Sequence, residues 1–276
     1  MLGLFYLYPI VDVFRLAFTN ATLIGSEEDF TLASVKAILT NPNLPGVLWT
    51  TAVFTLFSVV GQQFFGLAIA LLVVRGEKRG LVGVMALRTT VLVAWVIPGI
   101  ANGLIWQMLF SEAPYGALNS ALHMIGVGRV AWLSDPQIAM VSVIISNVWR
   151  GTAFSMIILY AALKSIDPTY FEAAEVDGAR GWQRFFYVTL PLLRTALLVN
   201  SILITIQTLN TFDAIISLTG GGPGRATEVI SLFTFNTVFR NYDLAGGCVL
   251  SVLMLLISLV LALAYALFLP RQESAA

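Results

Sequence analysis

Charged side chains are scarce in this sequence. Only 11% of its 276 residues are Asp, Glu, Lys or Arg, whereas 58% are hydrophobic. A soluble globular domain carries about 25% charged residues, which form its hydrated surface. The low charge excludes an ordinary soluble domain, and the hydrophobic residues lie in long runs rather than in short strands. The composition therefore predicts an all-α protein whose solvent is lipid.

Cysteine and histidine each occur once. Because Cys248 is the only cysteine, an internal disulfide and a cysteine-based metal cluster are excluded. Zinc sites and Ser-His-Asp triads need more histidine than the single His123, or a nucleophile placed beside it. We therefore expect no metal site and no catalytic residue, and we interpret His123 as a loop or interfacial side chain.

An excess of one charge and a nucleotide-binding motif are also lacking. The formal net charge is zero, so no bulk field attracts nucleic acid. The glycine-rich residues 220–224 are not followed by the Lys-Ser or Lys-Thr pair of a phosphate-binding P-loop, and we interpret them as a turn. We expect no cofactor in this chain and no ATP hydrolysis by it.

Six hydrophobic stretches are candidates for membrane spans. A spanning helix needs roughly 20 mostly apolar residues to cross a hydrocarbon core of about 30 Å. The stretches are residues 2–18, 47–74, 90–110, 138–163, 190–218 and 244–269. The first resembles a signal peptide in length, but no basic region or small-residue cleavage site frames it. We predict one transmembrane domain over residues 1–276.

The basic residues of the short loops predict the orientation, because they favour the cytoplasmic side. With six spans, the second and fourth loops lie on the same side as both termini. This side has nine basic residues: Arg75, Lys78, Arg79, Arg88, Lys164, Arg180, Arg184, Arg194 and Arg271. The other side has four: Lys36, Arg129, Arg225 and Arg240. Its acids are Glu27, Glu28, Asp29, Glu112, Asp135, Glu228 and Asp243. Both termini and the fourth loop are thus predicted to be cytoplasmic, and the outer loops acidic.

The fourth loop, residues 165–189, is too structured for a simple connection. Asp167 can cap a helix and Pro168 suits its first turn, so residues 170–176 are predicted to be helical. Gly178 follows where a left-handed turn would end that helix. Trp182, with two phenylalanines after it, gives a second segment an apolar face. Such a helix-turn-helix can dock in a groove of a partner protein, or it can lie on lipid.

The same loop carries a spaced motif. Glu172-Ala173-Ala174 is followed after three residues by Gly178 and, nine residues later, by a Val-x-Leu-Pro run that ends at Pro191. This pattern is similar to the EAA motif of bacterial ABC importer permeases, with Val in place of Ile. The resemblance implies that Glu172, Ala173, Ala174, Asp177, Gly178 and Pro191 belong to a cytoplasmic coupling helix. In that family the helix docks in a cleft of the ATP-hydrolysing subunit.

A second motif narrows the resemblance. Residues 218–223, Leu-Thr-Gly-Gly-Gly-Pro, followed by Ala-Thr-Glu-Val at 226–229, resemble the signature of maltose-transporter-type permeases and of related glycerol-3-phosphate importers. Weaker similarities are Tyr8-Pro9, Tyr115-Gly116, Leu118-Asn119, residues 132–135 and residues 148–150. The resemblance covers nearly the whole chain and implies the six-helix type I importer fold in the bacterial cytoplasmic membrane.

The resemblance also implies partners. They are a second homologous permease, which forms a heterodimer with this chain, and an extracytoplasmic substrate-binding protein. Two copies of an ATPase subunit would bind ATP and Mg. The solute expected from the resemblance is a sugar or a sugar-like molecule such as a glycerophosphate.

Polar side chains within the fifth predicted span are candidates for the substrate pathway. Gln207, Asn210 and Thr211 fall at i, i+3 and i+4 and would share a helix face, with Asn200 at i−7. Amide side chains match sugar hydroxyls, but they also form hydrogen bonds between membrane helices. Both roles stay open for Gln207 and Asn210, whereas packing is favoured for Asn200. Asp213, in the same predicted span, is a further candidate for the substrate pathway.

The third and fourth spans add further polar residues. Asn147 and Arg150 lie in the fourth, and an arginine inside a span costs about 2.5–3.5 kcal/mol on insertion scales. Arg150 should therefore face water or pair with an acid, for which Asp213 and Asp12 are alternatives. In the third span, Pro98 predicts a kink, and Asn102 and Gln107 form a second polar stripe.

Two other classes of membrane protein are alternatives. An ion-coupled secondary transporter usually has internal repeats and ionisable residues at the membrane midplane. The sequence shows no inverted repeat and few such acids. An intramembrane enzyme would need a catalytic dyad or an H-E-x-x-H motif, and neither occurs. An importer driven by ATP on separate subunits fits the motifs best.

Overall fold

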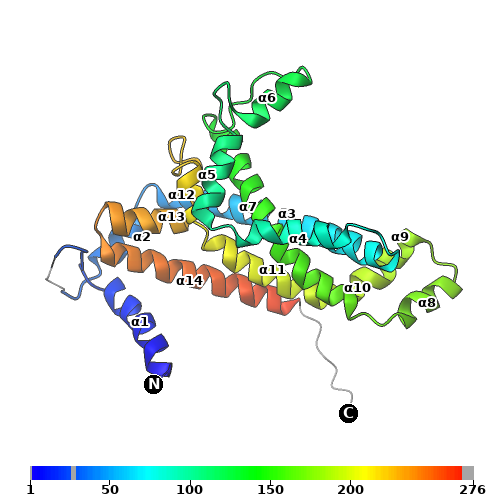
Figure 1. The fold of residues 1–276 in the computed structure, drawn as a ribbon. Coiled ribbons are helices and arrows are strands. Elements are labelled where there is room, and N and C mark those ends of the chain that lie inside the picture. The colour runs from blue at the N-terminus through cyan, green and yellow to red at the C-terminus, as the bar shows by residue number, and fades with distance from the viewer. Residues whose placement is uncertain (1, 26–28, 269–276) are drawn as a thin grey trace, which may run out of the picture. The chain divides into compact units, whose positions relative to one another are not determined.

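The computed structural model describes residues 2–25 and 29–268 (Figure 1). Within these ranges the regular secondary structure is helical, apart from one isolated antiparallel bridge between Thr19 and Phe30, so the all-α prediction is confirmed. The helices are α1 Leu2–Ala17, α2 Ala33–Leu39, α3 Leu44–Lys78, α4 Val84–Val96, α5 Gly99–Leu109, α6 Ala117–Met124, α7 Pro136–Lys164, α8 Thr169–Val176, α9 Gly181–Arg184, α10 Leu190–Leu192, α11 Arg194–Leu209, α12 Asp213–Leu218, α13 Ile230–Phe235 and α14 Leu244–Leu267. Two π-helical turns, η1 Phe185–Thr189 and η2 Asn236–Arg240, interrupt them.

The long helices match three of the predicted spans. By length and composition α3, α7 and α14 can each cross a membrane, and counting two bent helix pairs as one span each gives up to five. α1 has 16 residues, fewer than the roughly 20 that a span needs. The chain is therefore a multi-pass membrane protein by its helices, whereas the number six stays a prediction.

Two predicted spans are interrupted rather than continuous. The helix expected over 90–110 is divided into α4 and α5, because Ile97 adopts an extended conformation (φ −64°, ψ 125°) just before Pro98. Proline disfavours the helical conformation in the residue before it. The predicted kink is thus a complete break. The helix expected over 190–218 ends at Leu209 and resumes as α12, and it also bends by 64° between α10 and α11.

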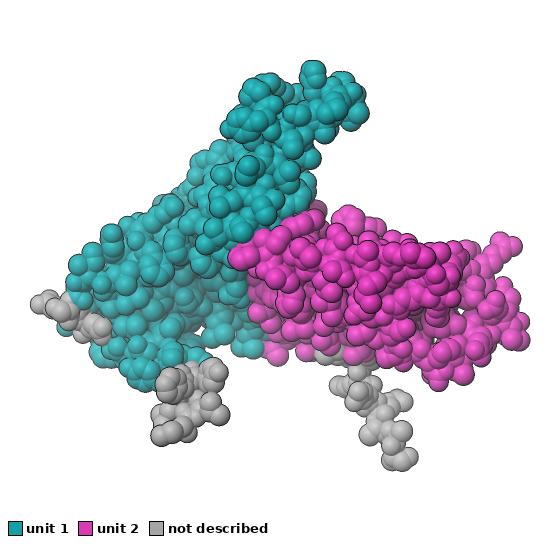
Figure 2. Space-filling view, in the orientation of Figure 1, with its two compact units in different colours: residues 1–56, 99–146, 208–260 teal, residues 57–98, 147–207, 261–276 magenta. Residues whose placement is uncertain are grey.

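The chain forms two compact units, each assembled from separate chain segments (Figure 2). Unit 1 comprises residues 1–56, 99–146 and 208–260, and unit 2 comprises residues 57–98, 147–207 and 261–276. In unit 1 one buried cluster includes Phe54, Phe110 and Ile215. In unit 2 a cluster around Met156 and Leu159 joins residues of α3, α7 and α11.

Glycines let α3 and α7 approach closely within unit 2. A Cβ added to Gly66 of α3 would overlap Ser155 of α7 and lie 3.0 Å from the Met156 nitrogen. A Cβ added to Gly151 of α7 would overlap the amide of Gln62. Small residues at such crossings are typical of membrane helix pairs, because packing rather than the hydrophobic effect holds these helices together.

Gly66→Ala should therefore destabilise the protein, by about 1–3 kcal/mol, because the added methyl group forces α3 and α7 apart. The midpoint of thermal unfolding in detergent measures the loss. Gly46→Ala is the matched control on the same helix, since nothing lies within 4 Å of a Cβ there. Equal midpoints for the two variants would contradict the close packing.

Candidate functional site

The short helix α8 begins as the sequence predicts. The Asp167 carboxylate accepts hydrogen bonds from the Thr169 N–H at 2.9 Å and from the Thr169 hydroxyl at 2.8 Å. Pro168 stands directly before the helix. The N–H and the hydroxyl of Thr169 hold the pKa of the Asp167 carboxyl below its ordinary value. The start of α8 is therefore fixed by local contacts within three residues.

The end of α8 is set by a glycine in the left-handed conformation. Gly178 has φ +74°, its N–H donates to the Glu175 carbonyl at 3.0 Å, and the Ala179 N–H donates to the Ala174 carbonyl at 2.9 Å. This pattern terminates helices and favours glycine. A Cβ at this position would meet nothing within 4 Å, so the backbone angle and not the space requires glycine. The predicted turn is confirmed.

One side of α8 packs and the other is open. Ala174 is buried, and the Lys78 ammonium at the end of α3 lies 5.2 Å from the centre of the Phe171 ring. Glu172, Ala173, Val176 and Asp177 are exposed, with Val176 at 88%. A carboxylate, a methyl group and a valine side chain on one surface form a small amphipathic face. Such a face suits contact with another protein.

The segment after Gly178 is helical as expected, but it contains a π turn. The Leu190 N–H donates to the Phe185 carbonyl five residues back, in η1. Pro191 has no N–H for the carbonyl four residues before it, so the α-helical ladder cannot run through this point. Trp182 and Phe186 are 58% and 55% exposed, so this segment too has an open apolar surface.

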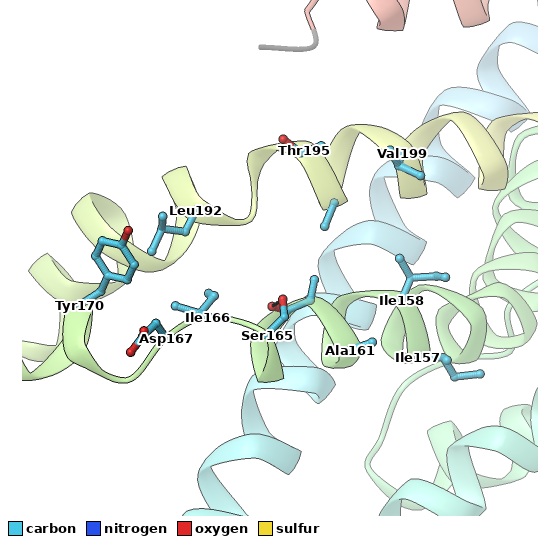
Figure 3. A pocket seen from close by; sticks show the side chains of 12 residues that line it. Ile157, Ile158, Ala161, Ser165, Ile166, Asp167, Tyr170, Leu192, Thr195 and Val199 are labelled. Carbon is cyan, nitrogen blue, oxygen red and sulfur yellow. Dashed lines mark hydrogen bonds between the residues drawn. The ribbon is translucent and has the colours of Figure 1, made fainter. Parts of the chain in front are cut away.

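An apolar groove borders the residues that lead into α8. It has a volume of about 680 Å³ and runs between the end of α7 and α11 (Figure 3). Ile157, Ile158 and Ala161 of α7 lie opposite Thr195 and Val199 of α11, and the groove continues to the residues that precede α8. Its lining is Ile157, Ile158, Ala161, Ala162, Ser165, Ile166, Asp167, Tyr170, Leu192, Thr195, Ala196 and Val199.

A polar cluster ties the helix after the α8 segment to two other helices. Asn200 of α11, which is fully buried, donates to Oε1 of Gln63 on α3 and to the Ser155 hydroxyl on α7 at 3.1 Å. Gln63 in turn donates to the Leu197 carbonyl at 3.1 Å. The packing role favoured for Asn200 is confirmed. Gln63 is not among the predicted residues, although two adjacent glutamines in an apolar run indicate a polar contact.

The predicted helix face around Gln207 is wrong. α11 ends at Leu209, so Asn210 and Thr211 lie in the break before α12 and cannot share a helical face with Gln207. The break frees backbone groups, and the Ser231 hydroxyl donates to the Thr211 carbonyl at 2.8 Å. An interrupted helix in a membrane protein needs such replacement partners.

Asp213 lies against the start of α5. A Cβ on Gly99 would overlap the Asp213 carboxylate, and one on Gly103 would overlap the Ser217 hydroxyl. The two glycines, four residues apart, thus let α12 lie directly on the α5 backbone. The carboxylate at the first turn of α5 also complements the positive end of that helix.

The remaining candidates of the substrate pathway are divided between the units. Asn147, Arg150 and Gln207 belong to unit 2, whereas Asn210, Thr211 and Asp213 belong to unit 1. Nε of Arg150 and Nδ2 of Asn147 are buried and have no hydrogen-bond partner in the described part of the chain.

Asp12, one of two alternatives for pairing with Arg150, pairs with Arg15 of its own helix at 2.8 Å. Asn102, of the second stripe, donates to the Ser146 hydroxyl at 2.9 Å.

The motifs between 112 and 135 build a separate polar framework in unit 1. The Asn119 amide pairs with the Val130 backbone through two hydrogen bonds of 3.0 Å and accepts a third, at 3.2 Å, from the Trp132 indole. Glu112 accepts bonds from the N–H groups of Leu133 and Ser134 and from the Ser134 hydroxyl. Burial raises the pKa of Glu112, but these donors outweigh it and hold the pKa below its ordinary value.

The glycine-rich residues form turns, as predicted. Gly220, Gly221 and Gly224 have φ values of +65°, +93° and +61°. The buried Thr227 hydroxyl donates to the Gly222 carbonyl at 2.8 Å and lies 2.7 Å from the Thr219 hydroxyl. The loop is therefore closed by its own residues.

Of the residues named for the loops, Glu27, Glu28 and Arg271 lie outside the described part of the chain.

Comparison with known proteins gives consistent matches. Residues 49–274 match the family model described as "Binding-protein-dependent transport system inner membrane component". The chain is 34% identical over 262 residues to the trehalose/maltose transport system permease protein MalF of Thermococcus litoralis, covering 95% of this chain and 87% of the relative. It is 30% identical over 267 residues to the sulfoquinovosyl glycerol transport system permease protein SmoG of Agrobacterium fabrum, covering 96% and 85%.

Solved structures show the same fold. A bacterial ABC transporter involved in the import of alginate contains a chain that superposes with a TM-score of 0.81 at 22% identity, covering 96% of this chain and 89% of that one. A second structure of the alginate transporter, in complex with an alginate pentasaccharide-bound periplasmic protein, also gives 0.81 at 22% identity, covering 95% and 88%.

Asn200→Leu should destabilise the protein by about 0.5–2 kcal/mol, because it leaves Gln63 and Ser155 without the amide that joins α3, α7 and α11. Thermal unfolding in lipid nanodiscs measures the change. Thr195→Val, an exposed polar-to-apolar change on the same helix, is the control and should have little effect. A wild-type midpoint for Asn200→Leu would show that the cluster does not hold the helices together.

Proposed function

Because the chain belongs to the family of binding-protein-dependent transport system inner membrane components, the permeases of ABC importers, we propose that it carries a sugar or sugar-like solute into the cytoplasm by alternating access. ATP hydrolysis on separate subunits, which bind ATP and Mg, drives the transport. The observation that carries this proposal is the capped helix α8, whose Glu172, Ala173 and Asp177 are exposed beside a left-handed Gly178.

The proposed assembly contains this chain and a second homologous permease as a heterodimer, with two ATPase subunits and an extracytoplasmic binding protein. The family description and the structure of the alginate transporter with its periplasmic protein support the last partner. Six spans in the bacterial cytoplasmic membrane, with both termini cytoplasmic, place residues 165–189 next to the ATPases. Two spans of this arrangement would be the broken or bent helices.

The exposed face of α8 would transmit the conformational change of the ATPases to the spanning helices. Short-range contacts fix both ends of α8, and its other side packs against the end of α3 through Phe171 and Lys78. A rigid element held in this way moves as a unit when its exposed face is displaced. The Asn200 cluster then connects α11, which follows this segment, to α3 and α7.

The solute class is supported by the relatives. Their names include trehalose and maltose, and sulfoquinovosyl glycerol. Asn147, Arg150, Gln207, Asn210, Thr211 and Asp213 remain the proposed lining of the pathway. Among the described residues, Nε of Arg150 and Nδ2 of Asn147 have no partner, and this supports the assignment, because a buried donor without a partner is costly unless water or solute satisfies it.

Glu172→Lys and Gly178→Asp should abolish uptake but leave membrane insertion intact. The first reverses the charge of the exposed face, and the second places a side chain at φ +74°, which strains the turn. Uptake of labelled sugar and the amount of protein in the membrane are measured together. Gly80→Asp is a matched control, because Gly80 also has a positive φ of 62° and open space around it but lies outside the segment. Normal uptake by either test variant would contradict the coupling role.

Uptake in intact cells should survive collapse of the ion gradients and stop when ATP is depleted. An ion-coupled secondary transporter, the alternative class, would behave in the opposite way because its driving force is the gradient. The measurement uses an uncoupler in cells whose ATP is maintained by glycolysis, and then the reverse condition.

A further inference from the structure

A second hollow lies between α8 and the end of α3, and its lining includes Glu172, which also belongs to the exposed face of α8. It has a volume of about 390 Å³, and all of its lining belongs to unit 2. The lining residues are Leu71, Val74, Arg75, Lys78, Leu163, Pro168, Phe171, Glu172, Glu175, Gly181, Arg184, Phe185 and Thr189. They come from three places: the end of α3, the end of α7, and both arms of the segment from 168 to 189.

The wall of this hollow is apolar and its rim is charged. Leu71, Val74 and Phe185 are among the apolar lining residues. Arg184 on the rim pairs with Glu175 at 3.3 Å, so these two charges offset each other. Arg75, Lys78 and the single acid Glu172 remain, which leaves an excess of one positive charge. An apolar wall with a cationic rim fits a molecule that has both a hydrocarbon part and an anionic group.

The rim cations are free to accept such a group. Within the described ranges the Arg75 guanidinium has no hydrogen bond or ion pair, and Lys78 contacts only the face of Phe171. A cation over an aromatic ring retains its capacity to bind an anion on its other side. Guanidinium groups bind phosphate oxygens in a bidentate manner, which lysine cannot do.

The position along α3 favours a membrane lipid as the source of that anion. α3 is one of the helices that can cross a membrane, and Arg75 and Lys78 occupy its last turn, directly after the predicted span 47–74. The end of a span lies at the level of the phospholipid head groups. Basic pockets between helices at the cytoplasmic end of a span bind anionic head groups, whereas scattered basic residues only attract them.

We propose that this hollow binds an anionic phospholipid, with its phosphate on Arg75 and Lys78 and hydrocarbon against Leu71, Val74 and Phe185. The same lipid would contact both α3 and the α8 segment, and so it would hold α8 against the end of α3. The effect on transport rests on the coupling role proposed above. Lipid binding and the ordering of α8 do not depend on that role, and both can be measured without transport.

The test compares phosphatidylglycerol with phosphatidylcholine of the same acyl chains, on the full-length chain in detergent. Native mass spectrometry counts the retained lipids, and hydrogen–deuterium exchange reports the order of residues 169–178. We expect selective retention of phosphatidylglycerol and slower exchange in these residues. The double variant Arg75→Gln and Lys78→Gln should weaken retention about thirtyfold, from about 1 kcal/mol per basic residue.

Three controls distinguish binding in this hollow from a general effect of charge or of phosphate. Arg79→Gln removes an exposed charge from the same turn that does not line the hollow, and it should retain the lipid. Arg75→Lys keeps the charge and should lose less than the double variant. Inorganic phosphate supplies the anion without a chain and should not slow exchange. Equal retention of both lipids, an Arg79→Gln loss as large as that of the double variant, or full protection by inorganic phosphate would overturn the proposal.

Discussion

Hydrocarbon offers no hydrogen bonds, and this constraint governs where the chain can interrupt a helix or place an amide. The interruption between α11 and α12 comes with a substitute partner from elsewhere in the same unit. The carbonyl of Thr211, at the break between α11 and α12, accepts a bond from Ser231. The NH2 group of the buried Asn200 donates to Gln63 and Ser155. The polar residues at this break and in this cluster therefore serve first to hold helices together.

Local contacts set the two ends of α8, and contacts with more distant residues attach it to its surroundings. Asp167 and Gly178 set the helix from within the segment, through bonds that span only a few residues. Phe171 under Lys78 and the Glu175–Arg184 pair then join the segment to α3 and to its own second arm. The exposed Glu175–Arg184 pair stabilises little by itself. Rigidity of this element thus depends mainly on the backbone geometry at its two ends.

Local chemistry was predictable from the sequence, and contacts between distant residues were not. Asp167, Pro168 and Gly178 act through their own backbone, so the start and end of α8 follow from residue type alone. The break after Leu209 was missed, because Asn210 and Thr211 fit a helical pattern as well as a break, and the bond from Ser231 that supports the break lies 20 residues away. The pairing of Asn119 with Val130 was hidden for the same reason. Periodicity could not predict a coupling role for residues 165–189; that prediction came from the resemblance to known permeases.

The π turn at 185–189 has a consequence for how this segment tolerates changes in length. A π turn is an α-helix with one residue inserted, held here where Pro191 interrupts the ladder. A π turn accommodates one residue more than an α-helical turn, so deleting one residue between Arg184 and Leu190 would change the winding there and turn everything before it relative to α11. Trp182 and the whole of α8 would then point elsewhere without any change in their own sequence. The number of residues between Gly178 and Pro191 therefore determines the rotation of α8 relative to α11 as well as the distance between them.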